Sequence, residues 1–553
     1  MNDFIPDPIR QGIARGWRIV DAARIEADQT LEADVVIVGS GAGGGVTAEI
    51  LALAGLKLII VEEGALRSSN DFKMREADAY PSLYQESAAR QTLDKGIKIL
   101  QGRTVGGSTT VNWTSSFRTP PSTLDYWRTR FGLDGFDAEA MAPWFETMEA
   151  RLHIGDWQAA PNENNALLKR GADKLGIPSG LIRRNVNGCW NLGYCGMGCP
   201  TNAKQSMLVT TIPSALDHGA LLVTTIPSAL DHGAQLVTRV RAERFAIKGE
   251  DVEELLCTGL QADGVAPNGR LLRLRAKHFV VAGGAINSPA LLLRSNAPDP
   301  HALLGKRTFL HPTLISAGIF PQRVDAYAGA PQTVYSDHFL HTAPIDGPLG
   351  YKLEAPPLHP VLLSTTMNGF GADHAAMMRQ FPHIQGMLAL LRDGFHEASP
   401  GGSVQLKDGA AVLDYPLNDF LWDGARRALL TMAEIQFAAG ASAVRPAHES
   451  ARAYTSWNEA QRAIAELPQA PHMTRVASAH VMGGCTMAGD ARLGVVAPNG
   501  RYRELANLSV HDGSLFPTSI GANPQLSIYG LTARLASGLA EDLTGQPAPR
   551  PGA

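Results

Sequence analysis

Residues 34–64 constrain the fold more than any other part of the chain. They read DVVIVGSGAGGGVTAEILALAGLKLIIVEEG, an apolar strand, a glycine-rich turn, an Ala-rich helix and a second apolar strand. Gly39, Gly41 and Gly44 have the spacing G-x-G-x-x-G, which permits a tight turn, close approach of backbone to a pyrophosphate, and packing of helix on strand. The diphosphate would bind the free N–H groups near Ala42, at the helix N-terminus. The stretch therefore predicts a Rossmann-like unit that binds a dinucleotide.

Glu62 ends the second strand of this unit. It follows Gly39 by about the ~20 residues expected of an acid that hydrogen-bonds a ribose hydroxyl. The glycine motif alone does not distinguish NAD, NADP and FAD, and its simpler interpretation is a flexible turn.

The length and the charge of the chain limit its partners. With 553 residues, two or three domains are expected. The net charge is −4 and no long run of Lys or Arg occurs, so neither a nucleic-acid groove nor a polybasic membrane patch is indicated. We expect small or roughly neutral partners.

No segment resembles a membrane span or a secretory signal. The first residues lack the apolar stretch of a signal peptide, and no run of about 18 apolar residues exists. This pattern predicts a cytoplasmic protein without a transmembrane segment and leaves peripheral membrane attachment open. Five cysteines, an odd number, argue against a disulfide framework.

The chain divides into segments of different character, which predict an α/β fold, α+β overall. We expect an N-terminal arm over 1–33 and the first part of the dinucleotide-binding domain over 34–311. Residues 312–470 are rich in Pro, Gly, His and aromatic residues, with few strong helical patterns, and predict a mixed antiparallel substrate domain. Residues 471–545 return to the first domain.

Two helix starts are predicted from capping residues. Ser288 and Pro289 suit the N-cap and first position of one helix, and Asn523 and Pro524 suit those of a helix over 525–541. The positive dipole end of the second helix would stabilise an anion placed before it.

A tandem repeat interrupts the first domain. LVTTIPSALDHGA occurs at 208–220 and again at 222–234. Two copies are too few for a solenoid. We interpret the duplicated segment, 208–234, as an extra surface loop; the alternative is an insertion that reshapes an entrance or contacts a partner.

Four separated blocks resemble the glucose–methanol–choline (GMC) family of flavoprotein oxidoreductases. They are the glycine turn, GRTVGGSTTVN at 102–112, GGAINSPALLLRS at 283–295, and the pair HVMGGCTM and GANPQLSI near the end. The second block, within residues 96–118, resembles the family's flavin-covering loop. The third departs from the family pattern, because Ser-Asn-Ala-Pro replaces its usual Ser-Gly-aliphatic-Gly ending.

The resemblance implies FAD as cofactor and oxidation of an alcohol to an aldehyde or ketone. The catalytic residues it implies are His480 and Asn523, the His/Asn version of cholesterol oxidase-like and alcohol dehydrogenase-like members. His480 would accept the hydroxyl proton, because imidazole titrates near neutral pH. Asn523 would hold the alcohol oxygen so that the α-hydrogen faces flavin N5. The helix beginning at Pro524 would favour negative charge at flavin N1.

Further cofactor contacts follow from the resemblance. The positions implied near the isoalloxazine or pyrophosphate are Gly106, Gly107, Ser108 and Asn112, and those near the ribityl and phosphate groups are Asp512 and Gly513. Glu62 becomes a ligand of the FAD adenosine ribose. His311 is left as a core residue.

A cysteine-containing loop over 188–206 resembles that of long-chain alcohol oxidase, cholesterol oxidase-like and sugar dehydrogenase members. Cys189, Cys195 and Cys199 could ligate an iron–sulfur cluster, as in some sugar dehydrogenase subunits. Their spacing, C-x5-C-x3-C, lacks an adjacent cysteine pair and the C-x2-C pattern common in cluster sites. We therefore favour structural cysteines.

The function hypothesis is oxidation of a hydrophobic or bulky alcohol. Oxygen, a quinone or a cytochrome could reoxidise the flavin, and a dehydrogenase is favoured by analogy with bacterial members. The alternatives are a hydroxynitrile lyase-like flavoprotein without net redox chemistry, a sugar dehydrogenase-like subunit with an iron–sulfur cluster, and a flavin-binding protein impaired by the duplication.

Overall fold

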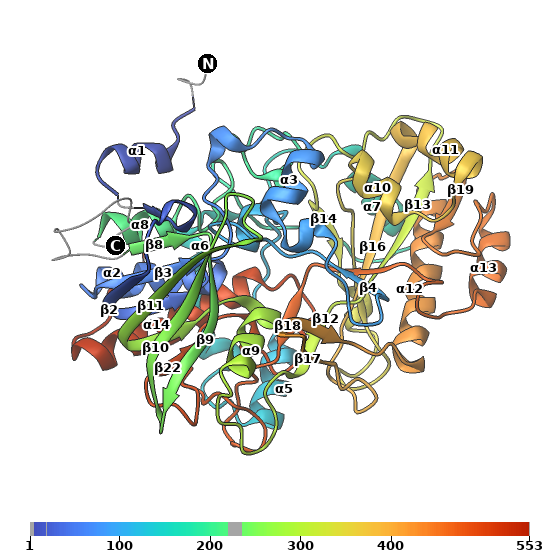
Figure 1. The fold of residues 1–553 in the computed structure, drawn as a ribbon. Coiled ribbons are helices and arrows are strands. Elements are labelled where there is room, and N and C mark those ends of the chain that lie inside the picture. Colours follow the sequence, from blue (N-terminus) through green and yellow to red (C-terminus); the bar gives the residue numbers. More distant parts are fainter. Residues whose placement is uncertain (1–4, 18, 219–234, 552–553) are drawn as a thin grey trace.

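Two halves lie side by side in the computed structural model, which describes residues 5–17, 19–218 and 235–551 (Figure 1). The first half is built on a sheet with strand order β1-β8-β3-β2-β11-β10-β9, and β22 pairs with β11. Its strands are β1 (Ile19–Asp21), β2 (Gln29–Val38), β3 (Leu58–Glu62), β8 (Gln235–Thr238), β9 (Val240–Lys248), β10 (Asp251–Leu260), β11 (Pro267–Val281) and β22 (Leu508–Val510). The strands from β1 to β11, with β22, pair in parallel, whereas β9 and β10 pair antiparallel.

The predicted Rossmann-like unit is β2–α2–β3, with α2 at Ala42–Leu53. Every residue of β3 is buried, as its continuous apolar run requires. Helix α2 also packs against α14 (Gln525–Thr544) and α8 (Thr211–Asp217). The C-terminal segment therefore returns to the first half, and residues far apart in the sequence meet at the glycine turn.

The N-terminal boundary differs from the sequence-based expectation. Strand β2 begins at Gln29, five residues before the expected domain start at 34, and its first half pairs with β11. Residues Ile19–Asp21 within the expected arm form β1 and pair with β8. The mixed polarity of this segment hides an edge strand, because an edge strand buries only part of its surface.

The second half is a largely antiparallel sheet with order β4-β20-β13-β16-β15-β14-β6, with β19 beside β13. Its strands are β4 (Ile97–Ile99), β6 (Gly180–Leu181), β13 (Thr313–Ile319), β14 (Val334–Ser336), β15 (Tyr351–Glu354), β16 (Ile384–Leu391), β19 (Ala443–Pro446) and β20 (Val476–Ser478). Strands β4, β6 and β20 come from outside 312–470, so the two halves are interleaved in sequence. A smaller sheet, β18 (Ala410–Asp414), β17 (Gly402–Lys407), β12 (Lys306–Leu310) and β21 (Val481–Gly483), lies beside them.

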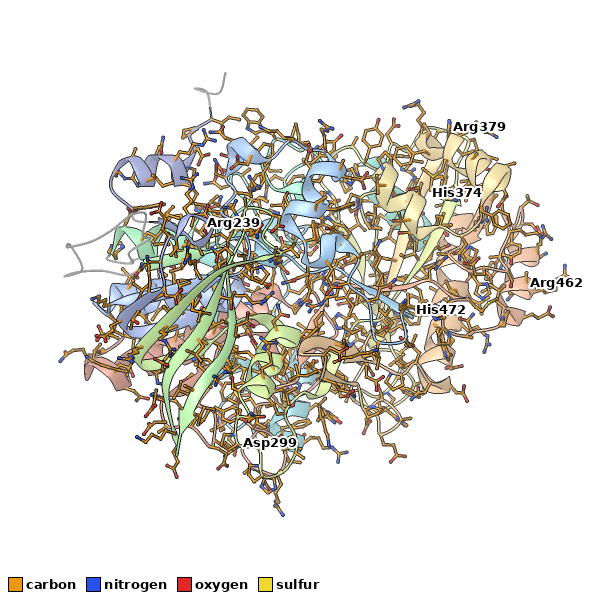
Figure 2. The ribbon with its side chains drawn as sticks, in the orientation of Figure 1. Arg239, Asp299, His374, Arg379, Arg462 and His472 are labelled. Atoms are coloured by element: carbon orange, nitrogen blue, oxygen red, sulfur yellow. The ribbon has the colours of Figure 1, made fainter. Side chains whose placement is uncertain are left out.

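The expectation of few strong helices in 312–470 is wrong. Helix α12, Asp419–Ala438, has 20 residues, begins at Asn418 as N-cap and packs against β13 and β16. Three further helices, α10 (Pro360–Thr366), α11 (Gly371–Arg379) and α13 (Trp457–Glu466), accompany it. Arg379 on α11 and Arg462 on α13 lie at the outer surface of this half (Figure 2). Some of the Pro and Gly residues that suggested loops belong to these helices: Pro360 begins α10, Gly371 begins α11 and Gly424 lies within α12.

Both predicted helix starts need correction. The helix of the third block, α9, spans Gly284–Arg294, so Ser288 and Pro289 lie inside it. Helix α14 has Pro524 at the N-cap and Gln525 as first residue, and the Asn523 side chain does not cap it. In both places the chain turns into helix without a side-chain cap, which leaves the polar side chains available for other contacts.

The repeat is described only in its first copy, where part of it forms α8. The second copy, 222–234, lies outside the described residues. Over the described part of the chain, no helix is long and apolar enough to span a bilayer.

Candidate functional site

A cavity of about 1090 Å³ is lined by residues of both halves. Ordinary small-molecule sites occupy about 300–1,000 Å³, so this one has room for a large ligand and a second, smaller molecule. The predicted site residues that line it are Gly39, Gly41, Ala42, Glu62, Gly107, Ser108, Asn112, His480, Asp512, Gly513, Asn523 and Pro524. Gly44 and Gly106, predicted with them, do not line it.

The glycine turn has the geometry that its spacing predicts. Gly39 has φ +103°, and a Cβ there would lie 2.3 Å from the Ala282 carbonyl oxygen. A Cβ on Gly44 would lie 1.9 Å from the Gly39 carbonyl oxygen, so Gly44 allows α2 to pack on β2 rather than contacting a ligand. Gly41 is different, because the nearest protein atom to its added Cβ, Gly107 Cα, is 3.8 Å away. Its backbone faces open space in the cavity.

Two glycine turns meet beside this space. Gly107, with φ +53°, would bring a Cβ to 2.8 Å from Gly41 Cα. Gly106 shapes the same turn: it has φ +85°, and its N–H donates to Ser40 Oγ at 3.0 Å. The absence of side chains lets the two turns pack against each other and gives the cavity beside them a wall of backbone atoms. This part of the cavity, called the slot below, suits a pyrophosphate.

Glu62 is buried and faces the slot from the end of β3. It accepts hydrogen bonds from Ser40 Oγ at 2.6 Å and from Gly64 N at 2.8 Å. Burial raises the pKa of the Glu62 carboxyl above its ordinary value, against the lowering effect of these donors. Its place suits a hydroxyl-rich ligand, since a ribose can supply further donors.

Asp512 lies near the start of α2 and is fixed by the third block. Its Oδ2 accepts from Ser288 Oγ at 2.5 Å and from Gly284 N at 2.8 Å, and its Oδ1 accepts from Ser514 N at 2.8 Å. Ser288 therefore orients Asp512 instead of capping a helix.

His480 and His311 are brought together by strand pairing. Leu310 at the end of β12 pairs with Val481 at the start of β21, so the residues just beyond this pair are neighbours. Their Nδ1 atoms are 2.9 Å apart. His311 is 1% exposed, whereas His480 is partly exposed and lines the cavity. The interpretation of His311 as a core residue missed this contact, which the sequence separation of 169 residues conceals.

The Gly521 amide favours one of the two arrangements of hydrogen atoms open to this pair. Gly521 N donates to His311 Nε2 at 3.2 Å, so neutral His311 carries its hydrogen at Nδ1 and donates it to His480 Nδ1. His480 then carries hydrogen at Nε2. Burial, with a smaller effect of the Lys352 ammonium, lowers the pKa of His480 to about 3. The imidazole is neutral at physiological pH.

Asn523 contacts two buried charged residues of β15. Lys352 Nζ donates to its Oδ1 at 2.9 Å, and its Nδ2 donates to Glu354 Oε2 at 3.3 Å. Lys352 and Glu354 are two residues apart and point to the same face of the strand. Neither was predicted, because no sequence motif marks them.

The cysteine loop supports the flavin-covering loop. Buried Arg184 donates from Nε to Thr114 Oγ1 at 2.7 Å and lies 3.9 Å from Cys195 Sγ through Nη2. Lys204, also buried, donates to the carbonyl oxygens of Thr110, Asn112 and Cys195. Cys189, Cys195 and Cys199 do not line the cavity, and the described residues contain no group of three or more His, Cys, Asp or Glu placed to hold a metal ion. The structural interpretation of these cysteines stays a prediction.

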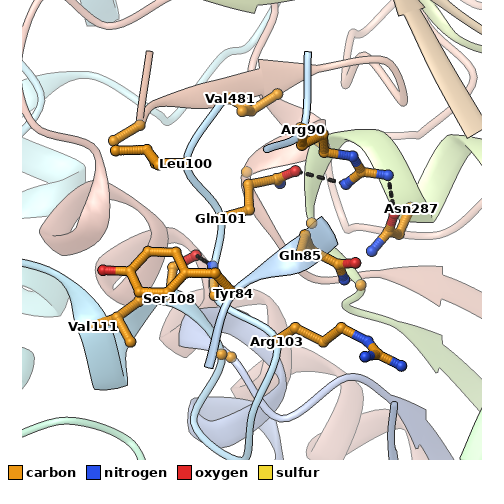
Figure 3. A pocket seen from close by; sticks show the side chains of 18 of the residues that line it. Tyr84, Gln85, Arg90, Leu100, Gln101, Arg103, Ser108, Val111, Asn287 and Val481 are labelled. Carbon is orange, nitrogen blue, oxygen red and sulfur yellow. Dashed lines mark hydrogen bonds between the residues drawn. The ribbon is translucent and has the colours of Figure 1, made fainter. Parts of the chain in front are cut away.

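Sequence reasoning also missed a buried cation in the cavity wall. Arg90 donates from Nη1 to Gln101 Oε1 at 2.7 Å and from Nη2 to Asn287 Oδ1 at 3.2 Å (Figure 3). It joins the flavin-covering loop to α9 at one end of the cavity. The only signal in the sequence is indirect: Gln101, the hydrogen-bond partner of Arg90, directly precedes the second family-like block.

One part of the cavity, called the aliphatic wing below, is apolar and is lined by residues of the second half. Its aliphatic side chains are Ile315, Leu358, Leu362, Leu363, Leu388 and Leu390. Helix α10 supplies Leu362, Leu363 and Thr366. The N-terminus of α14, at Pro524 and Gln525, lines the same cavity and directs its positive dipole end there.

The described residues fit FAD. The slot beside the two glycine turns suits the pyrophosphate, Glu62 suits the ribose, and the α14 N-terminus suits the negative charge of a reduced isoalloxazine.

Comparisons with known proteins agree with this geometry. Family models described as GMC oxidoreductase match residues 80–313 and 399–532. A GMC-type oxidoreductase of Mycobacterium tuberculosis (strain H37Rv), whose function is uncharacterized, is 31% identical over 93% of this chain and 78% of its own length. A long-chain-alcohol oxidase of Arabidopsis thaliana is 28% identical over 91% of this chain and 67% of its own length.

A solved structure shows the same fold. Formate oxidase of Aspergillus oryzae RIB40 matches with a TM-score of 0.67 and 14% identity, covering 94% of this chain and all of that one. The glycine turn, the C-terminal His and Asn, and the family models lead to one assignment: the chain belongs to the GMC oxidoreductase family, and FAD is its cofactor.

Proposed function

We propose that this protein oxidises a hydrophobic alcohol to the corresponding aldehyde or ketone. The observation that carries the proposal is the placement of His480 and Asn523 in one cavity with the dinucleotide slot and the aliphatic wing. The similarity to plant long-chain-alcohol oxidases supports the same substrate class. When bound, FAD supplies the hydride acceptor at N5.

Asn523 orients the alcohol through its amide. The oxygen of the amide is bound by Lys352 and one N–H by Glu354, which leaves the second N–H for the substrate oxygen. When Asn523 holds the hydroxyl, the rest of the cavity wall places the α-hydrogen on the adjoining carbon of the alcohol. Orienting the substrate in this way is the contribution expected of a positioning group.

His480 takes the hydroxyl proton in this proposal. For Nε2 to accept a proton, the hydrogen of neutral His480 must sit on Nδ1 and point to His311 Nδ1. His311 then carries its hydrogen at Nε2, and its bond from the Gly521 amide, which is long at 3.2 Å, opens. The low pKa of His480 keeps the imidazole unprotonated before the reaction. It also makes His480 a weaker base than the near-neutral imidazole expected from the sequence.

The aliphatic wing binds the hydrocarbon part of the substrate. Burial of each methylene contributes about 0.8 kcal/mol, so kcat/KM should rise by about fourfold for each carbon until the wing is filled. A series of straight-chain primary alcohols, assayed with oxygen and with a dye acceptor, tests this. A flat response to chain length, or a preference for polyols, would contradict the apolar substrate class.

Oxygen is the acceptor that the named oxidase relatives support, and a quinone or a cytochrome is the alternative from the sequence. The same assay decides between them, because hydrogen peroxide forms only when oxygen reoxidises the flavin.

A further inference from the structure

Lys352 is a buried cation next to the catalytic pair, and no role in the reaction follows from the family resemblance. Its side chain is 1% exposed on β15. The ammonium lies 3.0 Å from Glu354 Oε1, 2.9 Å from Asn523 Oδ1 and 3.0 Å from the centroid of the Phe117 ring. Burying a charge is costly unless it is paired, so a protein that keeps one at this depth gains something from it.

The contacts fix which way the Asn523 amide points. An ammonium only donates hydrogen bonds, so its partner on Asn523 is Oδ1, and an ionised carboxylate only accepts, so its partner is Nδ2. Glu354 Oε2 is held in turn by Gln332 Nε2 at 2.7 Å. A rotated amide would place Nδ2 against Lys352 and Oδ1 against Glu354, two repulsive contacts. The substrate therefore meets an N–H of Asn523 and not its carbonyl oxygen.

The charge of Lys352 also acts on the two histidines. It lowers the pKa of both His480 and His311, in each case after the larger effect of burial. The charged group closest to it is Glu354 on its own strand, and Asp337, which follows β14, acts from farther away. The other groups that face it are Asn523 and the rings of Phe117 and Tyr335.

We propose that Lys352 is a positioning residue: with Glu354 it holds the Asn523 amide with an N–H toward the substrate oxygen, and it places a positive charge beside His480. This inference rests on the proposed alcohol oxidation. It makes the ion pair of β15 part of the reaction machinery rather than a structural pair of the sheet.

The direct test is the ionisation of His480 in the FAD-loaded protein. Diethyl pyrocarbonate modifies only neutral imidazole, so its rate of reaction with His480, followed by peptide mass spectrometry across pH, gives the midpoint. The variant is Lys352→Met/Glu354→Gln, which removes both charges and leaves no unpaired carboxylate. Lys352→Arg, which retains the charge and a donor, is the matched control. The midpoint should rise in the double variant and stay near the wild-type value in the control.

The reaction supplies a second readout. His480 must be neutral, so the rate is lost as pH falls through its pKa, and the acid limb of kcat should move to higher pH in the double variant. Burial lowers the pKa of Lys352 to about 8, so wild-type kcat should also fall as pH rises through about 8. The double variant should lack that alkaline limb.

The outcomes separate this inference from the proposed function. An unchanged His480 midpoint in folded Lys352→Met/Glu354→Gln protein overturns the role of Lys352. If the variant does not fold, a wild-type kcat that stays constant between pH 7 and 10 overturns it. If no alcohol is oxidised, the proposed function fails, while the titration of His480 still decides whether Lys352 controls its charge.

Discussion

Replacing Lys204 with methionine tests whether the cysteine loop supports the cofactor site. The Lys204 side chain is 2% exposed, and its ammonium donates to Thr110 O at 2.5 Å, Cys195 O at 2.8 Å and Asn112 O at 3.0 Å. Thr110 and Asn112 belong to the flavin-covering loop and Cys195 to the cysteine loop. One side chain therefore ties the two loops together.

The size of the effect follows from these contacts. A buried carbonyl left without a donor costs about 1–3 kcal/mol, so three cost about 3–9 kcal/mol. Methionine also removes an unfavourable contribution, the burial of the ammonium charge. Burial lowers the pKa of Lys204 from 10.5 to about 8. At about 1.36 kcal/mol per pH unit, this shift corresponds to a cost of about 3 kcal/mol, which the variant does not have. We expect Lys204→Met to lower the free energy of unfolding by about 3 kcal/mol.

The assay compares Lys204→Met with Lys169→Met, whose ammonium forms an exposed i,i+4 pair with Asp173. An exposed pair contributes about 0.3–0.5 kcal/mol, so the control should unfold in urea at the wild-type midpoint. Lys204→Met should unfold earlier, be cleaved by protease within 188–206, and retain less FAD after purification. Equal FAD content and equal urea midpoints in the two variants would refute the argument.

Three further predictions concern the slot, the catalytic histidine and the substrate wing. Gly43→Ala should abolish FAD retention, because its Cβ would lie 1.6 Å from the His511 carbonyl oxygen, whereas Gly155→Ala, with no atom within 4 Å of its Cβ, should behave as wild type by absorbance. His480→Ala should retain FAD but lose about 10²-fold or more in the rate of anaerobic flavin reduction, the scale of a lost general base; unchanged reduction would remove His480 from the mechanism. Leu390→Trp should shorten the preferred alcohol chain, because it fills the wing, and an unaltered chain-length profile would place the substrate elsewhere.

Short-range sequence rules predicted the dinucleotide unit well. Gly39 and Gly44 have the roles that their spacing implies, because tight turns and helix packing depend on neighbouring residues. The same rules failed at Ser288 and Asn523, where capping preference favoured a helix start. In the structure both side chains serve tertiary contacts, Ser288 with Asp512 and Asn523 with Lys352.

The rest of the site depends on strand pairing over long separations. His311 meets His480 because β12 pairs with β21, and Lys352 reaches Asn523 because β15 lies in the sheet of the other half. A single sequence carries no signal of such a register. The pattern of β15 also misleads, since Lys352 and Glu354 in a strand would ordinarily indicate a solvent-facing side.

The central claim is that this cavity transfers hydride from an alcohol to bound FAD. Anaerobic addition of a long-chain primary alcohol to the FAD-loaded protein tests it most directly. The account predicts that the visible flavin absorption band bleaches, with one aldehyde formed for each flavin reduced. Product formation without bleaching, as a hydroxynitrile lyase-like reaction would give, or an unchanged band with every alcohol of the series, would contradict it.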